Sequence, residues 1–231
     1  MIVVALVPGA GMGRRIGPSA RKPFFEIGGL PIMAHTLKLL QSITAITEII
    51  PVLRNSDIDD TLALVEQYRI DKVGRIAPGG AERQNSVYNG LKLLGSSTDI
   101  VLVHDAVRPF ASRKMVEEII LQASRGISAV PGLPVKDTIK EVSGDGIVIS
   151  TLQRSRLMAV QTPQAFPFLT LKKAYDKAAA EGFFATDDAA LVEHMGETVK
   201  IVQGSYENIK ITTAGDLALA EFIYKNREGI T

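Results

Sequence analysis

The stretch that determines the fold is an apolar run at the start of the chain with a glycine-rich loop directly after it. The run is Ile2-Val-Val-Ala-Leu-Val7, and the loop is Pro8-Gly-Ala-Gly-Met-Gly-Arg-Arg-Ile-Gly17. A short run rich in β-branched residues that ends at glycine is typical of a buried strand. We therefore expect a first strand at residues 2–7, whose carboxyl end opens into a loop where backbone N–H groups can approach an anion.

Further along the chain, strand-length apolar runs alternate with helix-length amphipathic stretches. The predicted strands cover residues 2–7, 46–53, 72–77, 100–104, 127–130, 198–203 and 208–212. The predicted helices cover residues 31–41, 57–68, 82–94, 112–124, 168–181, 187–195 and 214–224. Such alternation indicates repeated β-α units around a mostly parallel sheet with helices on both faces. We expect an α/β fold of the Rossmann-like, three-layer, doubly wound type.

The alternation changes between about residues 134 and 155. Residues 138–142 and 147–152 form two alternating runs around Ser143-Gly-Asp-Gly146, which is a β-hairpin signal. An isolated hairpin does not bury its own apolar side, and a second subunit is one way to cover it. We therefore expect residues 1–231 to form a single domain with a protruding β-hairpin arm at about 134–155, whose apolar side a second subunit can cover.

Composition excludes several classes of protein. The chain has 231 residues, with 26 Lys+Arg, 25 Asp+Glu, three His and no Cys. This balance argues against a generic basic surface for nucleic acid or anionic lipid, and the missing cysteines exclude disulfides and thiolate zinc sites. The first apolar run is shorter than the roughly 20 residues that cross a bilayer, and it lacks the basic region of a signal peptide. We expect a cytoplasmic protein without nucleic-acid or membrane partners.

The glycine-rich loop ends in two arginines, and a lysine follows it. Arg14 and Arg15 can neutralise phosphate charge, and Lys22 can stabilise charge that builds up in nucleotidyl transfer. The spacing differs from the dinucleotide fingerprint, and the chain has no Gly-Lys pair of a Walker A loop. A polyphosphate site is the main interpretation, and a flexible turn with solvated cations is the alternative.

Two further motifs follow predicted strands. They are Pro78-Gly-Gly-Ala-Glu-Arg-Gln-Asn-Ser86 and His104-Asp-Ala-Val-Arg-Pro109. In doubly wound sheets the carboxyl ends of strands and the helix N-termini beyond them form the ligand crevice. An aspartate at the end of a buried strand is costly without a cation or ligand, so Asp105 is a candidate to hold Mg²⁺ or a ribose or polyol hydroxyl. The alternatives are an ordinary Gly-Gly turn and an Arg108 that only pairs with Asp105.

Later polar residues lie in otherwise apolar surroundings, and each has an ordinary structural explanation. They occur in Pro134-Val-Lys-Asp-Thr138, at Arg154, in Gln161-Thr-Pro-Gln164, in Thr186-Asp-Asp188 and in Asn208-Ile-Lys210. Thr186 and Asp187 can cap a helix, and residues 161–164 can form a turn. Lys210 can face solvent. Taken one at a time, these residues do not identify a site.

Taken together and in order, the motifs closely resemble those of the 2-C-methyl-D-erythritol 4-phosphate cytidylyltransferase family, over essentially the whole chain. The resemblance implies a nucleotidyltransferase that moves CMP from CTP to methylerythritol phosphate and releases pyrophosphate, in the non-mevalonate route to isoprenoid precursors. It also implies Mg²⁺ or another divalent cation, and attack of the acceptor phosphate on the α-phosphorus of CTP without a covalent enzyme intermediate.

The resemblance implies roles for individual residues. Arg15 and Lys22 resemble the pair that stabilises the pentavalent α-phosphate, and Arg154 and Lys210 resemble the pair that positions the acceptor phosphate. The implied CTP-binding residues are Pro8, Gly9, Ala10, Gly11, Gly13, Gly80, Ala81, Ser86, Asp105 and Ala106. The implied acceptor-binding residues are Asp105, Arg108, Thr138, Arg154, Thr162, Thr186 and Lys210, with Asp105 near the metal through CTP or water.

The arm also has a counterpart in the family, where it clasps a second subunit. The resemblance therefore implies a homodimer held together by the arm, in which Thr138 and Arg154 act in the partner's site. The nearest rival is a ribitol 5-phosphate cytidylyltransferase, which shares the glycine-rich loop and the motif at 104–109. A sugar-1-phosphate nucleotidyltransferase and a CTP-binding paralogue without activity are more distant, because the chain is short for the first and a pure binder does not need cations aimed at a transition state.

Overall fold

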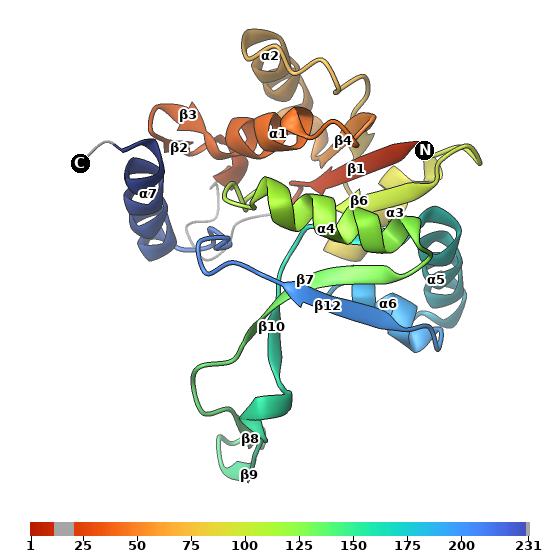
Figure 1. Ribbon diagram of the computed structural model, residues 1–231, viewed down its shortest axis with the longest axis vertical. Helices are drawn as coiled ribbons and strands as arrows, with labels where there is room; N and C mark the ends of the chain where they lie inside the picture. The colour runs from red at the N-terminus through yellow and green to blue at the C-terminus, as the bar shows by residue number, and fades with distance from the viewer. Residues whose placement is uncertain (12–20, 230–231) are drawn as a thin grey trace.

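The computed structural model describes residues 1–11 and 21–229, and within these residues the chain forms a three-layer α/β structure (Figure 1). The strands of the main sheet are β1 (Val3–Pro8), β4 (Glu48–Leu53), β5 (Ala77–Pro78), β6 (Ile100–Val103), β7 (Ser128–Pro134), β10 (Met158–Val160), β11 (Gln164–Pro167) and β12 (Val199–Gln203). The helices are α1 (Ile32–Ser42), α2 (Ile58–Gln67), α3 (Arg83–Lys92), α4 (Arg113–Ser124), α5 (Phe168–Glu181), α6 (Asp188–His194) and α7 (Ala214–Glu228). Short elements join them, namely η1 (Lys22–Phe24), η2 (Asn55–Asp57), η3 (Arg154–Arg156) and the pair β2 (Glu26–Ile27) and β3 (Leu30–Pro31).

The sheet is mostly parallel, as predicted. Its strand order is β10-β7-β11-β6-β1-β4-β5. β12 pairs with residues 128–132 of β7, and β10 pairs with residues 132–134 of the same strand. β1 runs parallel to β4 and β6, β4 to β5, and β12 to β7, whereas β11 runs antiparallel to β6 and β7, and β10 to β7. The carboxyl ends of the central strands therefore lie along one edge, where doubly wound folds place their ligands.

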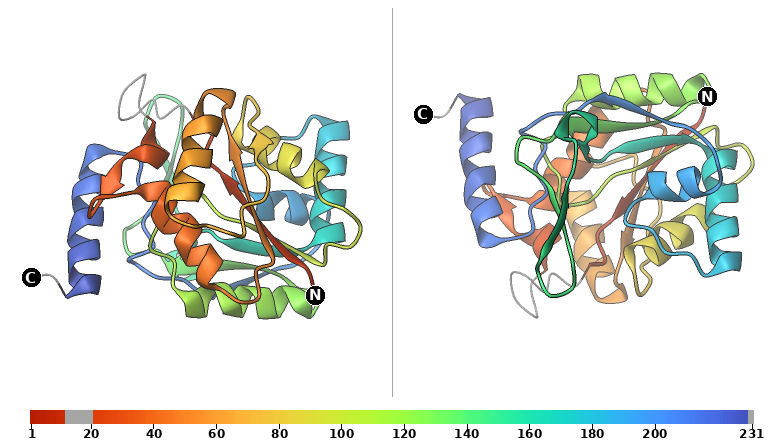
Figure 2. Two further views of the ribbon diagram at one scale, coloured as in Figure 1. Left: turned by 90° about the horizontal axis from the view of Figure 1, so that it is seen from above. Right: turned by 90° about the horizontal axis from the view of Figure 1, so that it is seen from below.

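Helices cover both faces because the central strands are apolar on both sides. From β1, Val3, Ala5 and Val7 face the layer of α1 and α4, and Val4 and Leu6 face the layer of α3, α5 and α6. All five side chains are at most 2% exposed. Figure 2 shows these two helical layers from opposite directions, with α7 standing beside them. A third, smaller cluster packs α7 onto β2 through Ile27, Ile211 and Ile223.

The hairpin arm leaves the body where β7 ends and β10 begins (Figure 1). It carries β8 (Lys140–Val142) and β9 (Val148–Thr151), which pair antiparallel as the sequence predicts. Gly146 has a φ of +83°, which a residue with a side chain rarely adopts, and it completes the turn between the two strands. Val142, Ile147 and Ile149 are 53–65% exposed, so one subunit leaves the apolar side of the arm uncovered.

The sequence pattern predicts two strands that the structure does not form as expected, and it misses two strands of the main sheet. In the predicted strand 72–77 only Ala77 lies in a strand, and residues 208–212 form an irregular segment. In that segment Ile211 is anchored by burial and by its N–H bond to the Val107 carbonyl. The missed strands are the antiparallel β10 and β11, because polar Gln164 suggests a turn although it is 1% exposed and starts β11. No helix within the described ranges is long and apolar enough to span a membrane.

Candidate active site

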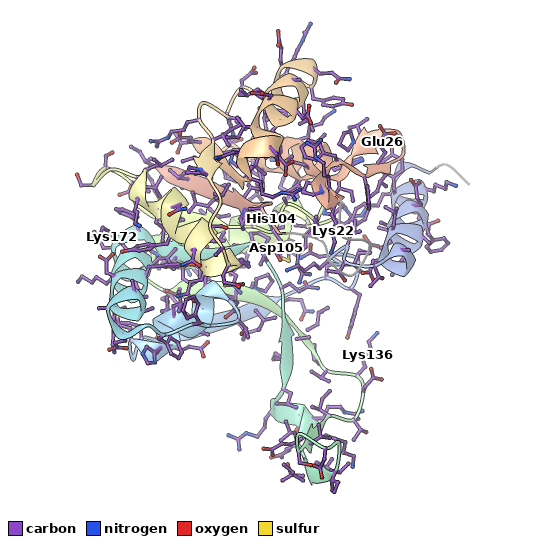
Figure 3. The ribbon with its side chains drawn as sticks, turned by 180° about the vertical axis from the view of Figure 1, so that it is seen from behind. Lys22, Glu26, His104, Asp105, Lys136 and Lys172 are labelled. Carbon is purple, nitrogen blue, oxygen red and sulfur yellow. The ribbon has the colours of Figure 1, made fainter. Side chains whose placement is uncertain are left out.

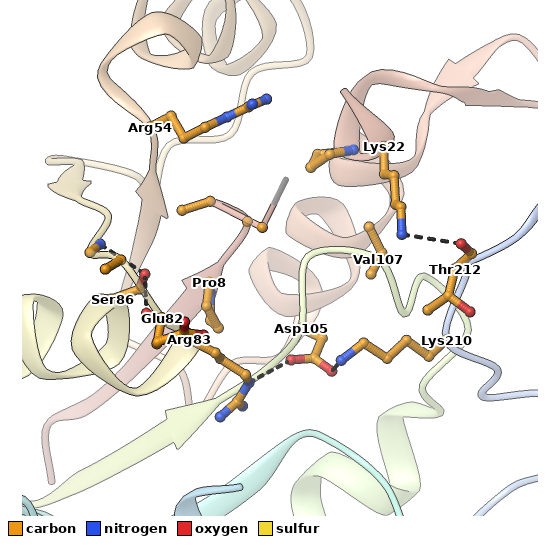
Figure 4. A pocket seen from close by; sticks show the side chains of 16 residues that line it. Pro8, Lys22, Arg54, Glu82, Arg83, Ser86, Asp105, Val107, Lys210 and Thr212 are labelled. Carbon is orange, nitrogen blue, oxygen red and sulfur yellow. Dashed lines mark hydrogen bonds and ion pairs between the residues drawn. The ribbon is translucent and has the colours of Figure 1, made fainter. Parts of the chain in front are cut away.

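A cavity of about 890 Å³ opens at the carboxyl ends of β1, β4 and β6, beside the start of α3 (Figure 4). This volume suits a ligand of nucleotide size. The residues that line the cavity are Pro8, Gly9, Ala10, Gly11, Lys22, Pro23, Arg54, Gly80, Ala81, Glu82, Arg83, Ser86, Asp105, Val107, Lys210 and Thr212. Residues from six separate stretches of the chain thus meet at the predicted edge of the sheet.

Two glycine-containing loops form one wall of this cavity. The N–H of Gly9 donates to the Val52 carbonyl at 2.9 Å, and the N–H of Gly79 donates to the Leu53 carbonyl at 2.7 Å. A Cβ atom on Gly79 would lie 2.4 Å from the Cβ of Ala10, so the two loops pack backbone against backbone. Close approach of this kind requires glycine and leaves the backbone of both loops near the cavity.

The loop before α3 is fixed by the side chain of Ser86. The Ser86 hydroxyl accepts a hydrogen bond from the Gly80 N–H at 2.9 Å and donates one to the Glu82 carbonyl at 3.0 Å. The Glu82 carboxylate caps the start of α3 in a capping box with Asn85. Because the Ser86 hydroxyl is held in this way, it orients the loop and is not placed as a nucleophile.

Asp105 is the electrostatic centre of the opposite wall. Its Oδ1 lies 3.1 Å from Nε of Arg83, and its Oδ2 lies 2.8 Å from Nζ of Lys210 and 3.6 Å from Nε of Arg108. Burial alone raises the pKa of a carboxyl group, but the positive charges of these three side chains outweigh it, and the pKa of Asp105 lies well below its usual range. Asp105 is therefore ionised at neutral pH.

His104 and Thr162 hold Asp105 from behind. Nε2 of His104 lies 3.0 Å from the Arg108 carbonyl, which only accepts, so Nε2 carries the proton and Nδ1 accepts from the Thr162 hydroxyl at 3.0 Å. The same hydroxyl accepts from the Asp105 N–H at 3.1 Å. Burial lowers the pKa of His104 to about 4, so the imidazole is neutral at pH 7. Thr162 thus lies beneath the cavity lining and fixes the positions of His104 and the Asp105 backbone.

Two lysines bring positive charge into the cavity from the same side. Lys22, at the start of η1, is 9% exposed, and its Nζ donates to the Thr212 carbonyl at 3.1 Å. Lys210 lies two residues before Thr212, and Figure 4 shows the Lys22 ammonium directed at the Thr212 carbonyl and the Lys210 ammonium directed at the Asp105 carboxylate. Cations held in this way can neutralise a phosphate as charge develops on it.

The structure brings most of the predicted site residues together. Those in the cavity lining are Pro8, Gly9, Ala10, Gly11, Lys22, Gly80, Ala81, Ser86, Asp105 and Lys210, and those directly behind it are Ala106, Arg108 and Thr162. Gly13 and Arg15 lie outside the described residues.

Three predicted residues lie away from this cavity within the chain. Thr138 and Arg154 are exposed on the arm, where Nη1 of Arg154 donates to the Lys136 carbonyl. Figure 3 shows Lys136 on the arm, well separated from Lys22 and Asp105. Thr186 lines a neighbouring hollow of about 500 Å³ together with Glu82, Arg83, Gln84, Phe184 and Ala185. Thr138 and Arg154 therefore do not line the cavity of their own chain.

Sequence reasoning missed Arg54 and the central part that Arg83 plays. Arg54 follows β4 directly, and its Nε lies 2.9 Å from Oδ2 of the buried Asp57. Because the carboxyl end of β4 meets those of β1 and β6, its position after a predicted strand was an available signal. Arg83 is named in a motif, but its bond to Asp105 joins residues 22 apart and carries no local signal.

The residues present do not form a metal site made by the protein alone. Among the described residues, no group of three or more His, Asp and Glu side chains could hold a metal ion. In the cavity lining Glu82 caps α3, which leaves Asp105 as the available carboxylate, and both of its oxygens face cations. One carboxylate fits Mg²⁺ only when phosphate oxygens and water supply its other ligands, as in many nucleotide sites.

Comparison with known proteins agrees with this geometry. The family model described as 2-C-methyl-D-erythritol 4-phosphate cytidylyltransferase (IspD) matches residues 3–226. The chain belongs to this cytidylyltransferase family. It is 45% identical, over 98% of its length and 97% of the relative's, to the 2-C-methyl-D-erythritol 4-phosphate cytidylyltransferase of Syntrophus aciditrophicus. It is 44% identical, over 98% and 96%, to that of Pelotomaculum thermopropionicum.

Solved structures of the family have the same fold. The chain superposes with a TM-score of 0.86 on 4-diphosphocytidyl-2C-methyl-D-erythritol synthase from Anaerococcus prevotii, at 33% identity over 97% of this chain and 96% of that one. The names of these cytidylyltransferases favour the methylerythritol interpretation over the ribitol 5-phosphate and non-catalytic alternatives. They also confirm the predicted fold class, a mostly parallel α/β sheet of the nucleotidyltransferase type.

Proposed function

We propose that the protein transfers CMP from CTP to 2-C-methyl-D-erythritol 4-phosphate, giving CDP-methylerythritol and pyrophosphate on the way to isoprenoid precursors. The observation that carries this proposal is the single cavity in which two close-packed glycine loops face Lys22, Lys210 and the ionised Asp105. A triphosphate suits the loops and cations, and a polyol phosphate suits the carboxylate and the second lysine. Membership of the cytidylyltransferase family names the donor and the acceptor.

The chemistry is a direct displacement. An oxygen of the acceptor phosphate attacks the α-phosphorus of CTP, a new P–O bond forms, and the bond from the α-phosphorus to the β-phosphate oxygen breaks, so that pyrophosphate leaves with that electron pair. Lys22 and Arg15 stabilise the charge on the five-coordinate α-phosphorus, and Lys210 and Arg154 align the attacking phosphate. Ser86 is committed to holding its loop, which supports transfer without an enzyme-bound intermediate.

The nucleotide and the acceptor occupy different walls in this proposal. CTP lies along Pro8, Gly9, Ala10, Gly11 and Gly13, with its base against Gly80, Ala81 and Ser86 and its ribose toward Asp105 and Ala106. The acceptor lies at Asp105, Thr186 and Lys210, with Arg108 and Thr162 directly behind them and Thr138 and Arg154 added by a second chain. Where Ala81 stands, recognition of the base falls to the backbone, because a methyl group neither donates nor accepts a hydrogen bond.

Mg²⁺, or another divalent cation, enters this site with CTP. Asp105 is the cavity-lining carboxylate that would lie near the cation, through CTP or water. When bound, the cation neutralises part of the triphosphate charge and favours departure of pyrophosphate.

The working form in this proposal is a cytoplasmic homodimer of the single nucleotidyltransferase domain. The exposed apolar side chains of the arm support it, because Val142, Ile147 and Ile149 would remain in water in a single chain. A partner also explains the positions of Thr138 and Arg154, which lie on the arm and do not line the cavity of their own chain.

The proposal is tested by pyrophosphate release. Purified protein with Mg²⁺ is given CTP with methylerythritol phosphate or ribitol 5-phosphate, and ATP, GTP and UTP replace CTP in turn. The expected result is release with CTP and methylerythritol phosphate far above every other pair. Preferred use of ribitol 5-phosphate, or silence with all pairs despite binding of CTP, would contradict the proposed acceptor or the proposed reaction.

A further inference from the structure

Arg83 connects the cavity to a buried charge in the body of the protein. Its Nε lies 3.1 Å from Oδ1 of Asp105, and its Nη2 lies 2.8 Å from Oδ2 of Asp188. Asp188 is fully buried at the start of α6, and its Oδ1 accepts a hydrogen bond from the hydroxyl of Tyr175 in α5. One guanidinium thus spans two carboxylates that belong to different layers of the fold.

This arrangement fixes the direction of the Arg83 guanidinium. Two of its nitrogens are bound to separate carboxylates, and Asp188 cannot turn away because Tyr175 holds its other oxygen. A planar guanidinium bound at two points has little freedom left, whereas the ammonium of a lysine is a point charge that does not impose a direction. The carboxylate of Asp105 is therefore held from its Oδ1 side, which leaves Oδ2 facing Lys210.

Arg83 also lies on the border between the two hollows. It lines the main cavity and the neighbouring hollow that contains Thr186. The nucleotide loop does not depend on its guanidinium, because Gly80 and Glu82 are held through Ser86. A disturbance at Arg83 therefore reaches the Asp105 carboxylate, which faces the acceptor and the ribose, and leaves the loop that faces the base in place.

We propose that Arg83 is a positioning residue that acts through Asp105. Anchored by Asp188 and Tyr175, it orients the Asp105 carboxylate toward Lys210 and the acceptor, and this inference rests on the proposed transfer to methylerythritol phosphate. The competing explanation is an ordinary buried ion pair that only stabilises the fold. Such a pair would change the unfolding free energy without a selective effect on the acceptor.

The two explanations are separated by a double-mutant cycle with Arg83→Gln, Asp105→Asn and the double variant. We expect Arg83→Gln to lower kcat/KM for methylerythritol phosphate by roughly 10- to 100-fold and to raise the Kd of CTP much less, because the loops that face the triphosphate and the base do not depend on Arg83. In the Asp105→Asn background the same substitution should add little further loss, because its target is already removed. Full multiplication of the two losses, or an equal loss of CTP affinity, would overturn the proposal.

Two further variants guard the interpretation against simple misfolding. Arg83→Lys keeps a positive charge between the carboxylates, so we expect a melting temperature near that of the unaltered protein together with a clear loss of kcat/KM for the acceptor. Arg75→Gln is the matched control, because Arg75 makes a two-point bond to Glu48 far from the cavity, at 2.6 and 2.9 Å. Full activity of a folded Arg83→Lys protein, or an equal loss in Arg75→Gln, would contradict a positioning role.

The unaltered protein separates failure of this inference from failure of the proposed function. If it does not turn over methylerythritol phosphate at all, the proposed function is wrong and the inference falls with it, since Asp105 then has no acceptor to meet. If it is active and the cycle is multiplicative, the function stands and only the role of Arg83 is wrong.

Discussion

Lys22 is the residue whose chemistry can be separated most cleanly from binding. Its ammonium is held at the Thr212 carbonyl, beside the place where the α-phosphate is expected. We expect Lys22→Ala to lower kcat by roughly 10²- to 10³-fold and to raise KM for CTP much less, because the lost charge acts mainly on the transition state. Arg15→Ala is also expected to lower kcat much more than it raises KM for CTP. Steady-state kinetics test both, and near-normal kcat in either variant would refute the role assigned to that residue.

His104 gives the protein a pH-dependent stability at the residue scale. Burial lowers its pKa to about 4, against about 6.5 in an unfolded chain, so the unfolded state binds the proton first as the pH falls. The stability that neutral His104 contributes is present at pH 7 and is lost as the pH falls from about 6.5 toward 4. We expect the free energy of unfolding to be about 2 kcal/mol lower at pH 5 than at pH 7 from this group.

Urea unfolding at the two pH values measures this difference. The His104→Gln variant should be less stable at pH 7 but should lack this part of the pH dependence. An unchanged pH dependence in the variant would show that other groups are responsible.

The arm is the element whose sequence most directly predicts an assembly. Ile149 is 62% exposed near its end, and burial against a second chain would remove it from water. A carboxylate placed there and left unpaired costs about 3 kcal/mol or more on burial, or roughly a hundredfold in the dimer dissociation constant. We therefore expect Ile149→Glu to be monomeric and weakly active in analytical ultracentrifugation and kinetics. Leu62→Glu, on the exposed face of α2 away from the arm, is the control, and a dimer in both variants would contradict the arm as the contact.

Elements whose signals are local were predictable, and contacts between distant elements were not. Residues 2–7, the start of the glycine-rich loop at 8–11 and Asp105 could be placed because the carboxyl ends of parallel strands meet at one edge of a sheet. The partner of Arg83 could not be predicted, because Asp188 is 105 residues away in sequence. The motif at 186–188 that contains Asp188 is equally typical of a helix start. The irregular segment 208–212 was missed for the same reason, since Asn208 bonds to the Thr162 carbonyl 46 residues away.

At the scale of the whole molecule, the arm and the cavity lie in different parts of one chain, so two chains should share two sites. Arg154 belongs to the partner's site in this proposal, and Lys210 belongs to its own. Mixed Arg154→Ala and Lys210→Ala subunits should therefore regain activity. In a symmetric dimer, random exchange gives one intact site in half of the dimers, or about a quarter of the unaltered activity. No recovery despite exchange shown by mass spectrometry would contradict action in trans.

The central claim is that this cavity joins an acceptor phosphate to the α-phosphate of CTP. The most direct measurement is a ³¹P NMR spectrum of CTP, methylerythritol phosphate and Mg²⁺ followed over time with the protein. The account predicts that the phosphomonoester signal of the acceptor disappears while two coupled signals of an unsymmetrical diphosphate and the signal of pyrophosphate grow together. Formation of CMP or CDP with the acceptor signal unchanged would contradict it, because CTP would then be hydrolysed and not used for transfer.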